Sequence, residues 1–186
     1  MLDKLLHYDY EIIIFLNSLG SEKWDWFWLF VTKPINWIWL VIFLSYLFTK
    51  TFGLKKGFQL ILTTFLTCVI TLLTVEFIKR GVARLRPINN EEIQHLLRIV
   101  EQTKNYSFVS GHAAFSFTLA FLSFKILLKP IRFVGLIFIF PLLFAYSRLY
   151  LGFHFLSDII SGLLLGFIIA NIGWLATKKW IFKESI

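Results

Sequence analysis

Three ionisable side chains, Arg148, His154 and Asp158, lie within residues 147–158, a stretch whose other residues are mostly apolar. If the chain is helical from residue 155 onward, His154 and Asp158 occupy positions i and i+4 and share a helix face. The carboxylate could then hold one imidazole nitrogen and leave the other free, as in an activated histidine. This stretch alone supports a second interpretation equally well, in which His154 and Asp158 cap a helix while Arg148 reaches to lipid headgroups.

Two further clusters carry similar chemistry. Six residues separate Lys79 from Arg86-Pro87, and Ser110-Gly111-His112 precedes an apolar run. Each cluster alone has an ordinary explanation, because cations flank membrane spans and serine caps helices. Their order, spacing and shared membrane face favour a function, since ionisable groups at membrane depth are costly and are usually functional.

Together the three clusters describe a site for an oxyanion. A phosphoryl group in transfer spreads negative charge over its oxygens, and preorganised donors stabilise that charge. Arg86 and Arg148 can each bind paired oxygens, and Lys79 adds a point charge. Backbone N–H groups of Ser110 and Gly111 at a helix start add fixed donors. This arrangement requires no metal, and the neighbouring loop offers no carboxylate cluster suited to magnesium.

The composition indicates a protein of the lipid bilayer. Of the 186 residues, 58% are hydrophobic and 19% aromatic, and the mean hydropathy is +0.73, beyond what a soluble core of this size uses. The formal net charge of +8 suits an anionic partner. Because the basic residues lie at the ends of apolar segments and within the clusters, lipid phosphates are favoured and nucleic acid is not expected.

The apolar segments predict one all-α integral membrane bundle with about five transmembrane helices. The expected spans are 35–49, 58–78, 112–128, 133–146 and 155–177, with a turn at 50–57. We expect a single domain, 1–186, with short interfacial helices in 1–33, the transmembrane bundle in 34–177 and a basic tail in 178–186. The long polar interruption 79–109 is the expected active-site loop.

The distribution of cations predicts the orientation. Five spans place 79–109 and 147–154 on one membrane face, and the opposite face collects nine cations with Glu184 as its single acid. The first face holds ten cations, but five of these lie in or beside the suspected site: Lys79, Arg80, Arg84, Arg86 and Arg148. With those five discounted, the positive-inside rule makes the lysine-rich face cytoplasmic and the site extracytoplasmic.

The clusters resemble the signature of the type 2 phosphatidic acid phosphatase superfamily, which reads K-x6-R-P, P-S-G-H and S-R-x5-H-x3-D. The corresponding segments here are Lys79-(x6)-Arg86-Pro87, Val109-Ser110-Gly111-His112 and Ser147-Arg148-(x5)-His154-(x3)-Asp158. All spacings agree, and the resemblance covers about residues 58 to 177. Val109 replaces the usual proline, at a position that offers no side-chain chemistry.

The resemblance implies a membrane phosphatase that needs no cofactor. His154 would be the nucleophile that forms a phosphohistidine, and Asp158 would orient and charge-stabilise its ring. His112 would protonate the leaving group and later help to activate water. The phosphoryl oxygens would be bound by Lys79, Arg86, Arg148, Ser110 and Gly111.

The resemblance also implies the class of substrate. It points to a phospholipid or isoprenoid phosphate, such as undecaprenyl diphosphate, phosphatidylglycerol phosphate, phosphatidic acid or a lipid A phosphate. The small size and the composition rich in Lys, Ile and Phe suggest a bacterial source, and hence a bacterial cytoplasmic (inner) membrane. A lipid phosphotransferase with the same site and a non-enzymatic membrane protein with an anion pocket stay open as alternatives. The oligomeric state is not predicted.

Four other residues are not expected to act in the site. Glu76 lies three residues before Lys79 and four before Arg80, so we expect an ion pair that positions the lysine. Cys68 falls in an apolar run and is expected to pack in the core. His7 and His95 are assigned to no site.

Overall fold

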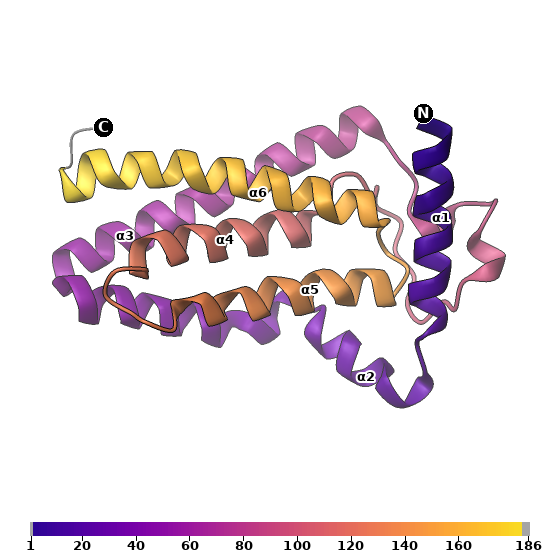
Figure 1. Ribbon diagram of the computed structural model, residues 1–186, viewed down its shortest axis with the longest axis horizontal. Coiled ribbons are helices and arrows are strands. Elements are labelled where there is room, and N and C mark those ends of the chain that lie inside the picture. Colours follow the sequence, from indigo (N-terminus) through magenta and orange to yellow (C-terminus); the bar gives the residue numbers. More distant parts are fainter. Residues whose placement is uncertain (1, 184–186) are drawn as a thin grey trace.

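The computed structural model describes residues 2–183, and every regular element among them is helical. The main helices are α1 (Leu2–Ser18), α2 (Glu22–Val31), α3 (Ile38–Val82), α4 (Gly111–Leu127), α5 (Ile139–Tyr150) and α6 (Leu156–Thr177). Short turns complete them: η1 (Pro34–Trp37), η2 (Pro87–Asn89), η3 (Gln94–Leu96), η4 (Val134–Phe138) and η5 (Lys178–Phe182). Helices α3 to α6 lie along the long axis of the molecule, and α1 crosses one end of them (Figure 1).

Helix α3 consists of two arms that meet at Gly53. This residue leaves the helical conformation, with φ 79° and ψ 163°, a region that glycine enters without steric cost, and the chain turns back there (Figure 1). The arms touch next to the bend, because a Cβ on Gly57 would lie 2.5 Å from the Cα of Thr49. The expected turn over 50–57 is therefore wrong in its extent, since the residues on both sides of Gly53 stay helical.

The apolar helices form a membrane bundle, as predicted. Pro34–Asn89 and Leu156–Phe182 are long and apolar enough to cross a bilayer, each with a mean hydropathy of 2.1 over its best window. Only 28% and 33% of those windows are buried inside the protein, so most of their apolar side chains face outward, as lipid contact requires. Gly53 divides the first of these segments into two helices, and two shorter apolar helices follow in Gly111–Leu127 and Val134–Tyr150. With Leu156–Phe182, the described residues therefore contain the five expected apolar helices.

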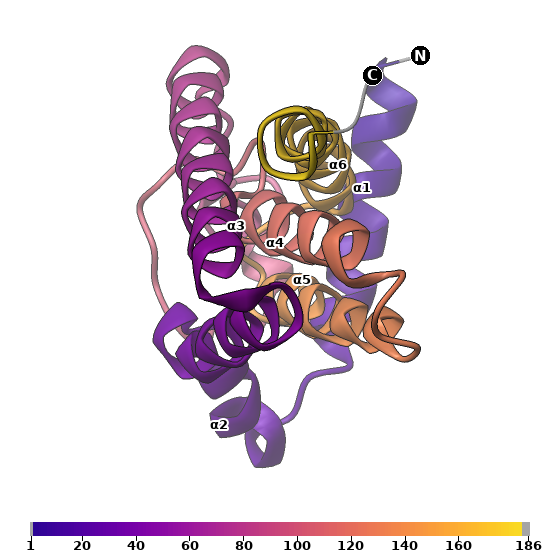
Figure 2. The ribbon, with the colours of Figure 1, turned by 90° about the vertical axis from the view of Figure 1, so that its left-hand side faces the viewer.

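Helix α4 occupies the centre of the bundle, between α3, α5 and α6 (Figure 2). Its contact with α6 is especially close, because α6 presents Gly162 and Gly166 to it. A Cβ on either glycine would lie 2.7 Å from a backbone oxygen of α4, that of Ser110 or that of Ala114. Small residues four apart let helix backbones approach in this way in membranes. Cys68 is buried in the neighbouring core cluster, as expected.

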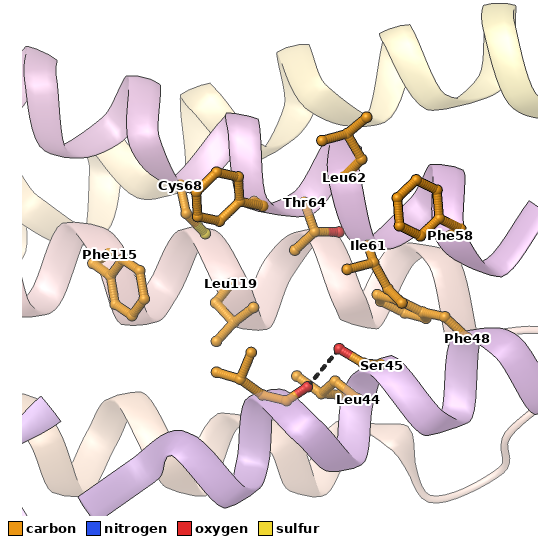
Figure 3. Close-up of a pocket in the computed structure, with 12 residues that line it drawn as sticks. Leu44, Ser45, Phe48, Phe58, Ile61, Leu62, Thr64, Cys68, Phe115 and Leu119 are labelled. Atoms are coloured by element: carbon orange, nitrogen blue, oxygen red, sulfur yellow. Dashed lines mark hydrogen bonds between the residues drawn. The ribbon is translucent and has the colours of Figure 1, made fainter. Parts of the chain in front are cut away.

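An apolar cavity of about 240 Å³ lies between the arms of α3 and α4 (Figure 3). The first arm contributes Leu44 and Phe48, the second contributes Cys68, and α4 contributes Phe115 and Leu119. The cavity thus lies inside the angle that the bend at Gly53 creates.

The N-terminal helices α1 and α2 are joined to the polar end of the bundle by buried and partly buried hydrogen bonds. Asn17 is fully buried and donates to the Tyr150 carbonyl over 2.8 Å, while its side-chain oxygen accepts the Arg98 N–H over 2.7 Å. Asp25 pairs with the Arg98 guanidinium at 2.8 Å and accepts the Tyr150 hydroxyl at the same distance. The N-terminal segment therefore holds both the loop after α3 and the end of α5.

Candidate active site

The three clusters predicted from the sequence meet at the end of the bundle that α1 crosses (Figure 1). Two loops supply Arg86, before η2, and His154, before α6. Four helix ends supply the other predicted residues: Lys79 near the end of α3, Ser110, Gly111 and His112 at the start of α4, Arg148 in the last turn of α5, and Asp158 in the first turn of α6.

A polar cavity of about 590 Å³ opens among these residues. Five of the eight predicted residues line it: Lys79, Arg86, Gly111, His112 and His154. The remainder of its wall comprises Glu76, Arg80, Lys104, Asn105 and Tyr106. The other three predicted residues lie outside this lining and are buried, with Arg148 6% exposed and Ser110 and Asp158 fully covered. Among residues 2–183, no group of three or more His, Cys, Asp or Glu side chains gathers as around a metal ion.

His154 and Asp158 face each other in a fully buried contact. The distance from His154 Nδ1 to Asp158 Oδ2 is 3.5 Å, and His154 Nε2 lies 3.3 Å from Arg86 Nη1. Because a guanidinium can only donate, Nε2 carries the lone pair and the imidazole proton is assigned to Nδ1, toward the carboxylate. Asp158 Oδ2 also accepts the N–H of Phe155 over 2.9 Å, as a capping residue does. Asp158 thus caps α6 and faces the imidazole at once.

The surroundings of His154 keep its imidazole neutral. Burial, followed by the positive charges of Arg86, Arg148 and Lys79, lowers the pKa of His154 well below its ordinary value of 6.5. Burial also lowers the pKa of Arg86, to about 10, which leaves this guanidinium charged at neutral pH. A neutral imidazole whose Nε2 carries its lone pair at the cavity, next to the charged Arg86, is suited to attack an electrophilic anion.

The two predicted arginines share one aromatic neighbour. The guanidinium carbon of Arg148 lies 4.4 Å and that of Arg86 5.7 Å from the centre of the Phe153 ring. Arg86 donates to the carbonyls of Asn105, over 2.8 Å, and Phe153, over 3.0 Å. Arg148 donates through Nη1 to the Thr32 hydroxyl over 2.6 Å, and its Nε is buried with no partner among the described residues.

The two predicted backbone donors at the start of α4, the N–H groups of Ser110 and Gly111, have different surroundings. Ser110 is the N-cap, and its hydroxyl oxygen accepts the Ala113 N–H over 3.4 Å. The backbone N–H of Ser110 donates to the carbonyl of Asp158 over 3.1 Å, so that donor is already engaged. Gly111, the next residue, lines the cavity. His112 follows it and packs edge-on against Phe144, with 4.8 Å between ring centres.

The expected pairing of Glu76 with Lys79 is wrong. Glu76 accepts from Arg80 Nε over 2.8 Å in an exposed pair, because the i,i+4 spacing brings these two side chains together. Lys79 instead donates to the carbonyl of Tyr106 in the loop after α3. The fold of that loop, which no local spacing specifies, therefore directs the lysine.

Two residues behind the site had no role assigned from the sequence: Arg84, which contacts Asp158, and Asp9, which contacts Arg84. Arg84 Nη1 donates to Asp158 Oδ1 over 2.7 Å, and Arg84 Nη2 donates to Asp9 Oδ2 over 2.9 Å. Asp9 belongs to α1 and is 7% exposed. The sequence signals were an acid within an amphipathic N-terminal helix and a second arginine two residues before Arg86, neither of which identifies its partner.

Comparison with known proteins settles the family. The family model described as the PAP2 superfamily matches residues 56–182, which include all three clusters. The chain belongs to the PAP2 superfamily. This confirms the resemblance seen in the motifs, and the chain is a phosphate ester hydrolase of that superfamily.

Two named phosphatases and one crystal structure resemble the chain over most of its length. A lipid A 4′-phosphatase of Bacteroides thetaiotaomicron is 32% identical over 174 residues, which cover 89% of this chain and 75% of the relative. An undecaprenyl-diphosphatase of Sulfolobus acidocaldarius is 30% identical over 155 residues, covering 83% and 64%. The crystal structure of a PAP2 type phosphatidylglycerolphosphate phosphatase from Bacillus subtilis matches with a TM-score of 0.72 over 95% of this chain and 88% of that one. Because the two sequences are only 16% identical, this similarity shows a shared fold and nothing about the substrate.

Proposed function

We propose that this PAP2 protein removes a phosphate from a lipid phosphate or diphosphate through a phosphohistidine on His154, without a metal ion. The observation that carries the proposal is the setting of His154. Its Nε2 lies at the cavity beside Arg86, its Nδ1 faces Asp158, and its lowered pKa keeps it neutral. An imidazole in this state is a ready nucleophile, and Asp158 stabilises the positive charge that the ring gains on attack.

The reaction follows in two steps. His154 Nε2 attacks the phosphorus, the bond from phosphorus to the leaving oxygen breaks, and that oxygen takes the electron pair and a proton from His112, whose protonated form the bound phosphate anion stabilises. Water then attacks the phosphohistidine while neutral His112 accepts its proton, and the phosphorus–nitrogen bond breaks to release phosphate. One residue serves as acid and then as base, as in other two-step hydrolyses.

The cations and the helix start bind the phosphoryl oxygens in this proposal. Lys79 and Arg86 line the cavity and present their charges to it, and the N–H of Gly111 lies at the positive end of α4. Arg148 stands behind them with an uncommitted Nε, which supplies a further donor once a phosphate is bound. Ser110 contributes by capping α4 and fixing its start against Asp158.

A lipid is the substrate that the surroundings favour. The apolar cavity between the arms of α3 includes Phe115 (Figure 3). Phe115 is one turn along α4 from His112, which lines the polar cavity, so a hydrocarbon chain could lie next to the phosphate site. The relatives named above act on lipid A and on undecaprenyl diphosphate. We therefore place lipid A 4′-phosphate and undecaprenyl diphosphate first among substrates, ahead of phosphatidylglycerol phosphate and phosphatidic acid.

We further propose a bacterial cytoplasmic membrane location, with the site on the extracytoplasmic side. The support is the positive-inside rule, applied to the nine cations at the end of the bundle remote from the site. A membrane-impermeant thiol reagent added to intact cells tests it, with Cys68 buried and silent. The reagent should label a His95→Cys variant and should not label a Lys55→Cys variant. The reverse pattern would contradict the orientation.

The decisive experiment is phosphate release in detergent over a panel of the four lipids. His154→Ala should abolish turnover, His112→Ala should nearly abolish it, and the exposed His95→Ala control should leave it unchanged. EDTA should have little effect, whereas strong inhibition reversed by magnesium would exclude the metal-free mechanism. Transfer of phosphate to an added acceptor lipid in preference to water would make the protein a phosphotransferase. No turnover of any lipid by the wild type would favour a non-enzymatic role.

A further inference from the structure

The Asp158 carboxylate has two oxygens with different partners. Oδ2 faces His154 Nδ1 at 3.5 Å and accepts the Phe155 N–H. Oδ1 accepts from Arg84 Nη1 over 2.7 Å, the shortest of these contacts. Since the carboxylate is fully covered, water does not hold it in place, and its orientation depends on these partners. The direction of Oδ2 toward the imidazole is therefore coupled to what holds Oδ1.

Arg84 is itself fixed by α1. Its Nη2 donates to Asp9 Oδ2 over 2.9 Å, and the side chains of Arg84 and Asp9 are 18% and 8% exposed. Ser157 completes the contact, since its N–H donates to Asp9 Oδ1 over 3.0 Å and its hydroxyl contacts both Arg84 and Asp9. The guanidinium also lies 3.9 Å from the centre of the Phe155 ring, which restricts its plane.

The charges require the guanidinium to lie between the two acids. Asp9 and Asp158 both approach Arg84 within hydrogen-bond distance in a poorly hydrated region, where unpaired carboxylates are strongly disfavoured. Without Arg84, the Asp158 carboxylate would lose its strongest partner and turn away from His154. Without Asp9, Arg84 would keep Asp158 but lose the contact that fixes its plane.

We propose that Arg84 and Asp9 are positioning residues for His154, which act by fixing the Asp158 carboxylate behind the imidazole. Neither lines the polar cavity, so neither touches a bound phosphate. The inference rests on the proposed role of His154. It makes α1, which lies outside the three sequence clusters, a working part of the phosphate site.

Positioning predicts a specific kinetic pattern. Arg84→Gln should lower kcat about 10- to 100-fold, because small misplacements of a reacting group have effects of that size, and should leave KM within about twofold. Asp9→Asn should lower kcat by a smaller factor, about 3- to 10-fold. Arg84→Lys should recover part of the loss, since its point charge can hold one carboxylate but not orient two.

The test compares these variants with wild type on a lipid phosphate that the wild type hydrolyses, with rates expressed per folded enzyme after thermal unfolding assays. Glu11→Gln is the matched control, because Glu11 lies on α1 two residues from Asp9 and forms an exposed pair with His7. Its kcat should equal that of the wild type. Each substitution is also made in an Asp158→Asn background, in single-turnover assays sensitive to slow rates. There Arg84→Gln should have little further effect, because its target is already altered.

A merely structural role would lower the folded fraction and leave the rate per folded enzyme unchanged. The inference is overturned if kcat of Arg84→Gln stays within twofold of wild type, or if its effect is equally large with and without Asp158→Asn. If Arg84→Gln does not fold, Arg84→Lys and Asp9→Asn decide by the same criteria. Equal phosphate release by wild type and His154→Ala would refute the proposed function itself, and this inference with it.

Discussion

Gly162→Ala should push the start of α4, which carries Gly111 and His112, away from the start of α6, which carries Asp158. Gly162 lies one helical turn after Asp158 on α6, and a Cβ there would stand 2.7 Å from the carbonyl oxygen of Ser110. Ser110 directly precedes Gly111 and His112, and its N–H bonds to the Asp158 carbonyl over 3.1 Å. The added methyl group therefore acts where the start of α4 meets the start of α6.

The size of the effect follows from that distance. Ordinary contact begins at 3.4 Å, so α4 and α6 must separate by about 0.7 Å, the difference from 2.7 Å, because the obstacle is backbone. Overpacking of this kind costs about 1–3 kcal/mol, and the gain in helix propensity from glycine to alanine offsets up to about 1 kcal/mol. A displacement close to 1 Å between His112 and His154 should lower kcat roughly 10- to 100-fold.

Two other glycines of α6 provide graded controls. A Cβ on Gly166 meets the Ala114 carbonyl at 2.7 Å, the same clash one turn farther from the site. A Cβ on Gly173 meets the Thr67 hydroxyl at 2.7 Å and the Thr67 methyl group at 2.9 Å, toward the end of α6 remote from the site. Thermal unfolding and phosphate release should show a similar loss of stability for Gly162→Ala and Gly166→Ala, with kcat falling most for Gly162→Ala and least for Gly173→Ala.

An equal fall of kcat in all three variants, or a fall that merely follows the loss of stability, would contradict this prediction. Either result would mean that the rate depends on the general packing of α4 with α6. A wild-type kcat in Gly162→Ala would mean that the starts of the two helices need no close contact for turnover.

Three further predictions concern the surroundings of His154 and Arg148. Thr32→Val should lower kcat/KM about tenfold, because it leaves the buried Arg148 Nη1 without its acceptor, whereas Thr32→Ser should retain wild-type kinetics; equal kinetics for both would exclude the hydrogen bond as the cause. When the pH falls from 7.5 to 5.5, the free energy of unfolding should drop by about 1.4 kcal/mol more in the wild type than in the His154→Gln variant. The reason is that below pH 6.5 the imidazole of the unfolded chain binds a proton, whereas the folded imidazole, with its lowered pKa, does not. Equal shifts of Tm in the two proteins would contradict this. Gly152→Ala should cost about 1–3 kcal/mol in thermal unfolding and reduce turnover, because Gly152 has φ 67° and its Cβ would lie 2.8 Å from Ile88 Cγ2; an unchanged Tm would show that the loop before His154 adapts freely.

The bundle and the phosphate cluster could be predicted because their signals are local. Apolar runs specify spans by length alone, and the spacings from Lys79 to Arg86 and from Arg148 through His154 to Asp158 are readable in single short stretches. The sequence also predicted where the chain turns between the first two spans, but it did not predict how few residues make the turn. A single glycine reverses α3, where the polar residues around it had indicated a longer turn.

The parts that escaped prediction depend on contacts between distant segments. Glu76 had two basic neighbours, and only the position of the Tyr106 carbonyl draws Lys79 away from it. The backbone N–H of Ser110 is used by a carbonyl of α6, which no spacing within α4 reveals. Arg84 and Asp9 are 75 residues apart, so neither shows in sequence that it belongs to the other.

The contact of α1 with the far end of the chain also sets an order of events during synthesis. Asp9 leaves the ribosome early, yet it bonds to Ser157, 148 residues later. At about 5–20 residues per second, translation takes roughly 7–30 s to supply that partner. Throughout this interval the start of α6, which α1 contacts through Asp9, has not been made, and Asp9 has no Ser157 to bond with. On the proposed mechanism, a nascent chain that already carries Lys79, Arg86 and His112 has no complete site until His154 and Asp158 are made, and we expect full activity only after α1 has docked against Ser157.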